Sequence, residues 1–256
     1  MTSRRVAITG AASGLGAATR ARFETEGAVV VGIDLAGSDV DADLSAAPGR
    51  RLAVDAVGRV HDALDVLVCC AGLGPQAADP ARILAVNHFG AVEVLDGLSD
   101  RLAAGTDPAA VLISSNSVML DPTIDADLVD ACTRGDEADA RRLAARLSGS
   151  TVYASSKQAL ARAMRRRAAP LAALGVRVNA VAPGAFDSPL LQGGLDDPVL
   201  GPLIEALPIP LGRRGRADEI ADVVAWLCGT GARYVHGSVL VVDGGTDALL
   251  FPDRVP

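Results

Sequence analysis

Tyr153 and Lys157 place a phenol and an ammonium group four residues apart, near the start of a run rich in alanine and arginine. In a helix, residues at i and i+4 share one face, so the two side chains would be neighbours. A free phenol titrates at about 10 and accepts protons poorly at neutral pH, whereas a fixed cation beside it stabilises the phenolate. The pair therefore suggests proton transfer. Taken alone, the spacing is more typical of a surface tyrosine and a solvated lysine, so the hypothesis depends on other residues.

A glycine-rich turn follows the first β-rich run, residues 5–9, and precedes a segment with helical periodicity at 17–26. Glycines at such a turn let the backbone approach a ligand closely, and the N-terminus of the next helix offers free N–H groups to a pyrophosphate. Many turns of this kind contain glycines for packing reasons alone. The predicted pyrophosphate site consists of Gly10, Gly14 and Gly16, and Ser13 and Leu15 of the same turn are further predicted cofactor-binding residues.

An apolar run at 28–33 ends in Asp34, about 20 residues beyond the glycines. A carboxylate at this position can accept both hydroxyls of an adenosine ribose and would repel a 2′-phosphate. Neither residues 11–13 nor residue 35 is Arg or Lys. The sequence therefore favours NAD over NADP as a cofactor.

Strands and helices alternate along the rest of the chain. We expect further strands at 39–42, 64–70, 109–113, 176–182 and 238–242, and helices at 48–61, 81–104, 151–174 and 218–228. This alternation predicts an α/β fold, a doubly wound parallel sheet (Rossmann fold) of about seven strands with helices on both faces. The whole chain, 1–256, is expected to form one dinucleotide-binding catalytic domain.

Two segments fall outside the alternation. Residues 116–150 are predicted to be a helical insertion with short helices at 124–132 and 136–147. Residues 185–215 are rich in Pro, Gly and Leu and too long for a plain connection, so we expect a substrate lid there.

Composition argues against several classes of partner. A net charge of −7 disfavours nucleic acid binding. The four cysteines and three histidines have no metal-ligand spacing, so no metal site is expected. No apolar segment is long enough to cross a bilayer, and no secretion signal is recognisable at the N-terminus, so we expect a cytoplasmic protein without a membrane partner.

Taken together, these signals resemble the short-chain dehydrogenase/reductase family over nearly the whole chain. The resemblance rests on TGxxxGxG at 9–16, Asp34, Ala71-Gly72, Asn87, Ser115, Tyr153-x-x-x-Lys157 and Pro183-Gly184. Local sequence at 70–76, 86–90 and 234–237 is most similar to the 3α-hydroxysteroid dehydrogenase/carbonyl reductase branch. The interval between Ser115 and Tyr153 is longer than in most family members, in agreement with the predicted insertion.

The resemblance implies catalytic roles for four residues. Tyr153 would exchange a proton with the substrate oxygen, Ser115 would hold that oxygen, and Lys157 would lower the pKa of the phenol. Asn87 would position a water molecule that connects Lys157 to solvent. Hydride would pass between the substrate carbon and the nicotinamide.

The resemblance also implies the remaining binding residues. The rest of the NAD site would consist of Asp43 and Leu44 at the adenine, Ala71 and Gly72 at the adjoining ribose, Tyr153 and Lys157, and Pro183, Gly184 and Ser188 near the nicotinamide. The expected substrate site consists of Ser115, Met119, Tyr153, Phe186, Leu190 and Leu191. Such an apolar pocket suits a hydrophobic secondary alcohol or ketone, such as a hydroxysteroid.

Alternatives remain open at this point. An NAD-dependent dehydrogenase of a terpenoid alcohol, a polyol or a β-ketoacyl thioester would use the same catalytic residues, and Arg213, Arg214 and Arg216 are a candidate basic rim for an acidic carrier protein. A non-catalytic dinucleotide-binding protein is disfavoured because Ser, Tyr and Lys are all present. By resemblance we expect a homodimer or homotetramer built through the long helices around Asn87 and Tyr153, with residues 116–150 taking part in, or altering, the subunit contact.

Overall fold

A seven-stranded parallel sheet forms the centre of the computed structural model, which describes residues 3–254. Within those residues the strand order is β3-β2-β1-β4-β5-β6-β7, and every neighbouring pair is parallel. The strands are β1 (Arg5–Thr9), β2 (Val29–Asp34), β3 (Val40–Asp41), β4 (Val66–Cys69), β5 (Ala109–Ile113), β6 (Arg177–Pro183) and β7 (Val239–Val242). The predicted doubly wound sheet is confirmed.

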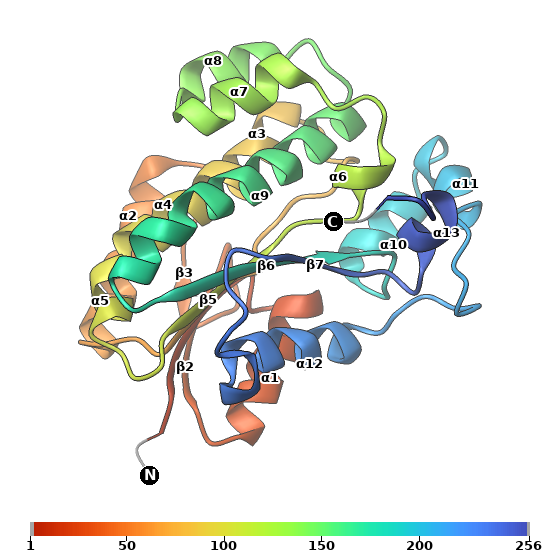
Figure 1. Ribbon diagram of the computed structural model, residues 1–256. Coiled ribbons are helices and arrows are strands. Elements are labelled where there is room, and N and C mark those ends of the chain that lie inside the picture. Colours follow the sequence, from red (N-terminus) through yellow and green to blue (C-terminus); the bar gives the residue numbers. More distant parts are fainter. Residues whose placement is uncertain (1–2, 255–256) are drawn as a thin grey trace.

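Helices cover both faces of the sheet (Figure 1). One face carries α1 (Gly14–Thr25) and α12 (Ala217–Cys228), and the other carries α2 (Ala47–Val60), α4 (Ala91–Gly97) and α9 (Gly149–Ala173). Successive strand residues point to opposite faces. In β1, Val6 and Ile8 pack with α1 and α12, whereas Ala7 joins the core under α2, α4 and α9. Burial on both faces explains why the strands are continuous apolar runs.

The carboxyl ends of the central strands meet at one edge of the sheet. Thr9 of β1 lies beside Cys69 of β4, and the strand order reverses between these two strands. Ligands of open α/β sheets bind at this kind of switch point. The segments that follow β1, β4, β5 and β6 therefore come together there.

The single helix expected at 81–104 is wrong in detail. The structure divides it into α3 (Pro80–Leu84), a π-helical turn η1 (Ala85–Gly90), α4 and, after Leu98, α5 (Ser99–Ala103). Single π-helical turns inside α-helices frequently occur at functional sites. Here the turn contains Asn87, whose amide is bonded outside the helix.

Residues 116–150 contain α6 (Ser117–Leu120), α7 (Ala126–Arg134) and α8 (Glu137–Ala144). The last two helices agree with the two expected ones, and they lie as an additional layer outside α3 and α9 (Figure 1). Asp125 caps α7 by accepting a 2.7 Å hydrogen bond from the Leu128 amide, and Gly135 ends it with φ +78°. A left-handed glycine is the usual end of such a helix.

Residues 185–215 contain α10 (Pro189–Leu195) and α11 (Leu200–Glu205), which lie at the carboxyl ends of the strands. The short helices η2 (Thr230–Ala232) and α13 (Thr246–Leu250) complete the described chain. Over residues 3–254, no helix combines the length and the apolar character needed to cross a membrane.

Candidate active site

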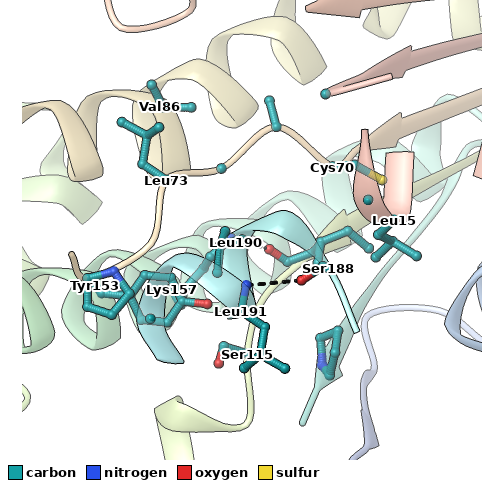
Figure 2. A pocket seen from close by; sticks show the side chains of 18 of the residues that line it. Leu15, Cys70, Leu73, Val86, Ser115, Tyr153, Lys157, Ser188, Leu190 and Leu191 are labelled. Carbon is teal, nitrogen blue, oxygen red and sulfur yellow. Dashed lines mark hydrogen bonds between the residues drawn. The ribbon is translucent and has the colours of Figure 1, made fainter. Parts of the chain in front are cut away.

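A cavity of about 420 Å³ opens at the carboxyl ends of β1, β4, β5 and β6. Every residue predicted to bind the cofactor lines it, from the glycine-rich turn to Ser188. Ser115, Tyr153, Phe186, Leu190 and Leu191 of the predicted substrate site also line it, and Figure 2 shows several of these side chains around the same space. The fold thus brings together residues that are up to about 180 positions apart in the chain.

The glycine-rich turn has the geometry that a phosphate site needs. Gly10 has φ +71°, and a Cβ there would lie 2.7 Å from the Ala71 backbone nitrogen; a Cβ on Gly16 would lie 1.9 Å from the Gly10 carbonyl oxygen. Only glycine fits such contacts. The Ser13 side chain makes no capping hydrogen bond to α1. The N-terminus of α1 thus has no side-chain cap at the cavity wall, which fits a pyrophosphate ligand.

The carboxylates of Asp34 and Asp43 line the part of the cavity that is predicted to hold the adenosine. Asp34 accepts hydrogen bonds from the Ala12 amide at 2.9 Å and from the Leu35 amide at 2.7 Å, which fixes its carboxylate at the end of β2. Two oxygens have about four lone-pair sites, so acceptor capacity remains for ribose hydroxyls. The hydrogen bond from Ser45 lowers the pKa of Asp43, and Arg82 lies 3.3 Å from its other oxygen.

Tyr153 and Lys157 lie on α9, opposite the end of β5. The Lys157 ammonium is buried, donates to the Ile113 carbonyl at 2.8 Å and lies 5.9 Å from the centroid of the Tyr153 ring. The Ser114 hydroxyl donates to the Lys157 carbonyl at 3.1 Å and ties α9 to β5. Ser115 and the half-buried Tyr153 line the same space (Figure 2).

Burial shifts the acidity of both groups. Burial lowers the pKa of Lys157 to about 8. It raises the pKa of Tyr153, and the hydrogen bond with Ser115 opposes this shift only in part. At neutral pH the phenol is protonated and can donate a proton to an acceptor in the cavity.

Asn87 is fully buried and does not line the cavity. Its Oδ1 accepts from the Leu73 amide at 2.8 Å, and its Nδ2 donates to the Leu73 carbonyl at 3.0 Å and to Ser156 Oγ at 3.3 Å. A Cβ on Gly72 would lie 3.3 Å from Asn87 Oδ1 and 3.5 Å from Lys157 Nζ. Asn87 therefore holds Gly72 and Leu73, the part of the cavity wall that lies next to Lys157, in place.

Met119 is the one residue of the predicted substrate site that does not line the cavity. Ser117, two residues earlier in α6, lines the cavity, whereas Met119 does not. Positions two apart on a helix point in nearly opposite directions. The Met119 carbonyl is instead bonded by Arg254 at 3.2 Å.

Sequence reasoning also missed a part of the wall. The missed lining residues include Leu73, Pro75, Gln76, Asp121, Ser150, Ile204 and Leu207. Gln76 Nε2 donates to the Leu190 carbonyl at 3.1 Å, which joins the segment after β4 to α10. A Cβ on Gly193 would lie 2.7 Å from Gln76 Nε2. The glycines in the 185–215 segment were the only signal that a side chain packs closely there.

Comparison with known proteins agrees with this geometry. The chain is 44% identical to 3-alpha-hydroxysteroid dehydrogenase/carbonyl reductase of Comamonas testosteroni over 253 residues, which span 97% of this chain and 98% of that protein. This chain belongs to the short-chain dehydrogenase/reductase family. A further relative is cis-4-hydroxycyclohexanecarboxylate dehydrogenase of Sinomonas cyclohexanicum, which is 34% identical over 96% of this chain and 98% of that protein.

Two further comparisons agree with this family membership. A family model described as enoyl-(acyl carrier protein) reductase matches residues 139–247. The crystal structure of the 3-alpha-hydroxysteroid dehydrogenase from Pseudomonas sp. B-0831 complexed with NADH superposes with a TM-score of 0.96 at 43% identity, over 98% of this chain and 100% of that chain. The resemblance seen in the sequence is confirmed, and the protein is an oxidoreductase.

Proposed function

We propose that this enzyme is an NAD-dependent oxidoreductase that interconverts hydrophobic secondary alcohols and ketones, with hydroxysteroids as the leading substrate class. The observation that carries the proposal is the convergence of Tyr153, Lys157 and Ser115 in one cavity with an apolar outer wall. The similarity to the Comamonas protein and to the NADH complex of the Pseudomonas protein supports the same conclusion.

The residues of the cavity fit a dinucleotide. The glycine-rich turn suits the pyrophosphate, Asp34 suits an unphosphorylated adenosine ribose, and Asp43 and Leu44 suit the adenine. When bound, the nicotinamide supplies or accepts the hydride. Arg and Lys are absent from residues 11–13 and 35, which favours NAD over NADP.

The remaining steps belong to side chains of the protein. In reduction, Tyr153 donates its phenolic proton to the carbonyl oxygen of the substrate; in oxidation, it removes the proton of the alcohol. Ser115 donates a hydrogen bond to the same oxygen and stabilises the charge that develops there. Lys157, buried behind the phenol, compensates the charge of the phenolate. Asn87 positions a water molecule that connects Lys157 to solvent, and its bonds to the Leu73 backbone support this position.

The substrate class follows from the outer wall. Apolar side chains dominate it: Leu73, Phe186, Leu190, Leu191, Ile204 and Leu207. Two of the three arginines expected to form a basic rim are neutralised locally, because Arg213 pairs with Glu219 at 2.7 Å and Arg216 pairs with Asp218 at 3.0 Å. This arrangement disfavours an acidic carrier protein and its β-ketoacyl thioester.

Turnover by the purified enzyme tests the proposal. Androsterone, a sugar alcohol and a β-ketoacyl thioester would each be assayed with NAD(H) and with NADP(H). We expect turnover of androsterone with NAD and little with NADP. Turnover of the thioester alone would overturn the substrate class, and equal use of NADP would overturn the role of Asp34.

We also propose a homodimer or homotetramer in the cytoplasm. Family members usually associate through the helices around Asn87 and Tyr153, but α7 and α8 pack on α3 and α9 here. This packing supports an altered subunit contact. Sedimentation of the protein with residues 118–148 excised should reveal a changed oligomer; an unchanged oligomer would contradict the altered contact. Fractionation of source cells tests the compartment.

A further inference from the structure

Arg50 of α2 is an almost fully buried cation, 1% exposed, outside the cavity. Its guanidinium donates to three backbone carbonyls, those of Leu44 at 2.8 Å, Ala85 at 3.2 Å and Ser45 at 3.4 Å. Leu44 and Ser45 follow β3 at the adenine end of the cavity, and Ala85 begins the π-helical turn η1. One side chain therefore joins the adenine wall to the segment that contains Asn87.

Two carboxylates balance the charge of Arg50. Glu93 of α4 and Glu137 of α8 each lie 2.7 Å from its Nη1, and Glu137 also accepts from Nη2 at 2.9 Å. Burial alone would raise the pKa of Glu137, but the hydrogen bonds from Arg50 and Arg141 lower it. Removing a partner of a buried cation strongly destabilises the folded protein. Arg50 thus depends on a residue of the 116–150 segment.

Arg141 adds a second connection from the same helix. It pairs with Glu137 at 2.7 Å and donates to the Ser45 carbonyl at 2.7 Å. The Ser45 carbonyl is therefore held by two guanidinium groups, one from α2 and one from α8. Neither Arg50, Glu137 nor Arg141 lines the cavity.

We propose that Arg50 and Glu137 are positioning residues for the cofactor. The pair holds the backbone of Leu44 and Ser45 in the geometry that binds adenine, so α8 contributes to cofactor affinity without touching the cofactor. The inference rests on the proposed assignment of Asp43 and Leu44 to the adenine. It gives the 116–150 segment a function within the subunit, independent of any subunit contact.

Binding of adenosine monophosphate, the adenylate half of NADH, tests this role directly. Glu137→Gln keeps the shape of the side chain but removes its charge. We expect its dissociation constants for adenosine monophosphate and for NADH, measured by calorimetry, to rise by about five- to tenfold. Turnover at saturating NADH should change less than about twofold, because the reacting groups are untouched.

The matched control is Asp139→Asn on the same helix, where the carboxylate pairs with exposed Arg142. It should leave both dissociation constants unchanged. Arg141→Gln, at a half-exposed position, should weaken adenosine monophosphate binding by about two- to threefold and serves if Glu137→Gln does not fold. Glu137→Asp, which restores the charge, should recover part of the affinity.

Two results separate the possible failures. A folded Glu137→Gln variant, or Arg141→Gln in its place, that binds adenosine monophosphate like the parent would overturn the positioning role. Asp43→Ala tests the adenine assignment itself. If Asp43→Ala also leaves adenosine monophosphate binding unchanged, the proposed adenine site is wrong; if it weakens binding while Glu137→Gln does not, only the positioning role is lost.

Discussion

Lys157 is the single lysine of the chain, and it is placed where charge is unfavourable for folding. Burial lowers its pKa to about 8, below the value of about 10.4 expected in the unfolded chain. Between these two pH values the unfolded state binds more protons, so this group makes the protein more stable as pH rises through that window. At neutral pH the buried ammonium thus opposes folding, and its retention is explained by chemistry rather than stability.

Replacing Lys157 with Met should make the protein more stable and remove its activity. Met has a similar shape and no charge, so we expect the free energy of unfolding at pH 7 to rise by about 1–3 kcal/mol while turnover is lost. Urea denaturation of both proteins at pH 7 and pH 10 measures this. The gain should shrink at pH 10, where the lysine is neutral in the folded parent. An equal gain at both pH values would contradict the assigned charge effect.

At the residue scale, sequence predicted identities better than acidity. Ser115, Tyr153 and Lys157 could be placed at the cavity because each lies at a strand end or on a helix face whose position the fold class determines. The pKa of Tyr153 could not, because burial of the phenol depends on side chains from distant elements. The position of Met119 outside the cavity wall could not be predicted, because the single turn of α6 decides which side chain faces the cavity and that turn has no clear periodicity.

At the scale of elements, Gln76 connects the segment after β4 to α10. Its hydrogen bond to the Leu190 carbonyl holds the helix that contributes Leu190 and Leu191 to the outer wall. Without this hydrogen bond to the Leu190 carbonyl, α10 would be attached mainly by apolar packing. We therefore expect Gln76 to control how firmly the 185–215 segment closes the cavity.

Gln76→Ala should loosen α10. We expect KM for a hydrophobic ketone to rise about three- to tenfold with a smaller effect on kcat, and amide hydrogen exchange over 189–195 to accelerate. Gln192→Ala is the matched control, since exposed Gln192 bonds only Asp196 within the same helix. Unchanged exchange over 189–195 in the Gln76 variant would show that this hydrogen bond does not hold the segment.

Element boundaries show where sequence reasoning ended. Strand positions were predicted well because strands buried on both faces are continuous apolar runs. The break in 81–104 was missed, because apolar periodicity does not record contacts such as the bonds between Asn87, in the π-helical turn, and the Leu73 backbone. The helices of 185–215 were hidden by proline and glycine, which are tolerated at helix starts and in short helices.

At the scale of the whole molecule, the α7–α8 layer is joined to the core partly through His88. The buried ring donates from Nε2 to the Cys132 carbonyl at 3.0 Å, and its Nδ1 has no partner in the described chain. Burial lowers the pKa of His88 to about 4, despite the carbonyl and the nearby charge of Glu137; Arg50 and Arg167 lower it further. Protonation would add a proton to Nδ1, where the new N–H would have no acceptor in the described chain.

Acid should therefore weaken this layer. Because the folded pKa of His88 lies below its unfolded value of about 6.5, its contribution to stability is complete above that pH and is lost as pH falls toward 4. We expect His88 to account for up to about 3 kcal/mol of the loss in unfolding free energy between pH 7 and pH 4. His88→Gln, which keeps a donor but does not titrate, should show a smaller loss over that range. Parallel pH curves for the two proteins would contradict this role.

The general architecture of the molecule was predictable, but the place of its outer layer was not. Two short helices were predicted where α7 and α8 lie, the second from its cap. The face on which they pack depends on Leu128, Val129 and Cys132 matching apolar side chains of α3 and α9. The ion pair between buried Arg50 and half-buried Glu137 could not be predicted either, because an arginine and a glutamate 87 residues apart look like two surface charges in a sequence.

The most direct test of the account is the removal of one oxygen atom. Tyr153→Phe keeps the ring and its packing but removes the group that exchanges a proton with the substrate. NAD-dependent oxidation of androsterone by the purified variant should fall by about 100-fold or more, while the dissociation constant for NADH stays within about threefold of the parent value. Turnover close to that of the parent, at equal NADH binding, would contradict the central claim that Tyr153 is the acid and base of this enzyme.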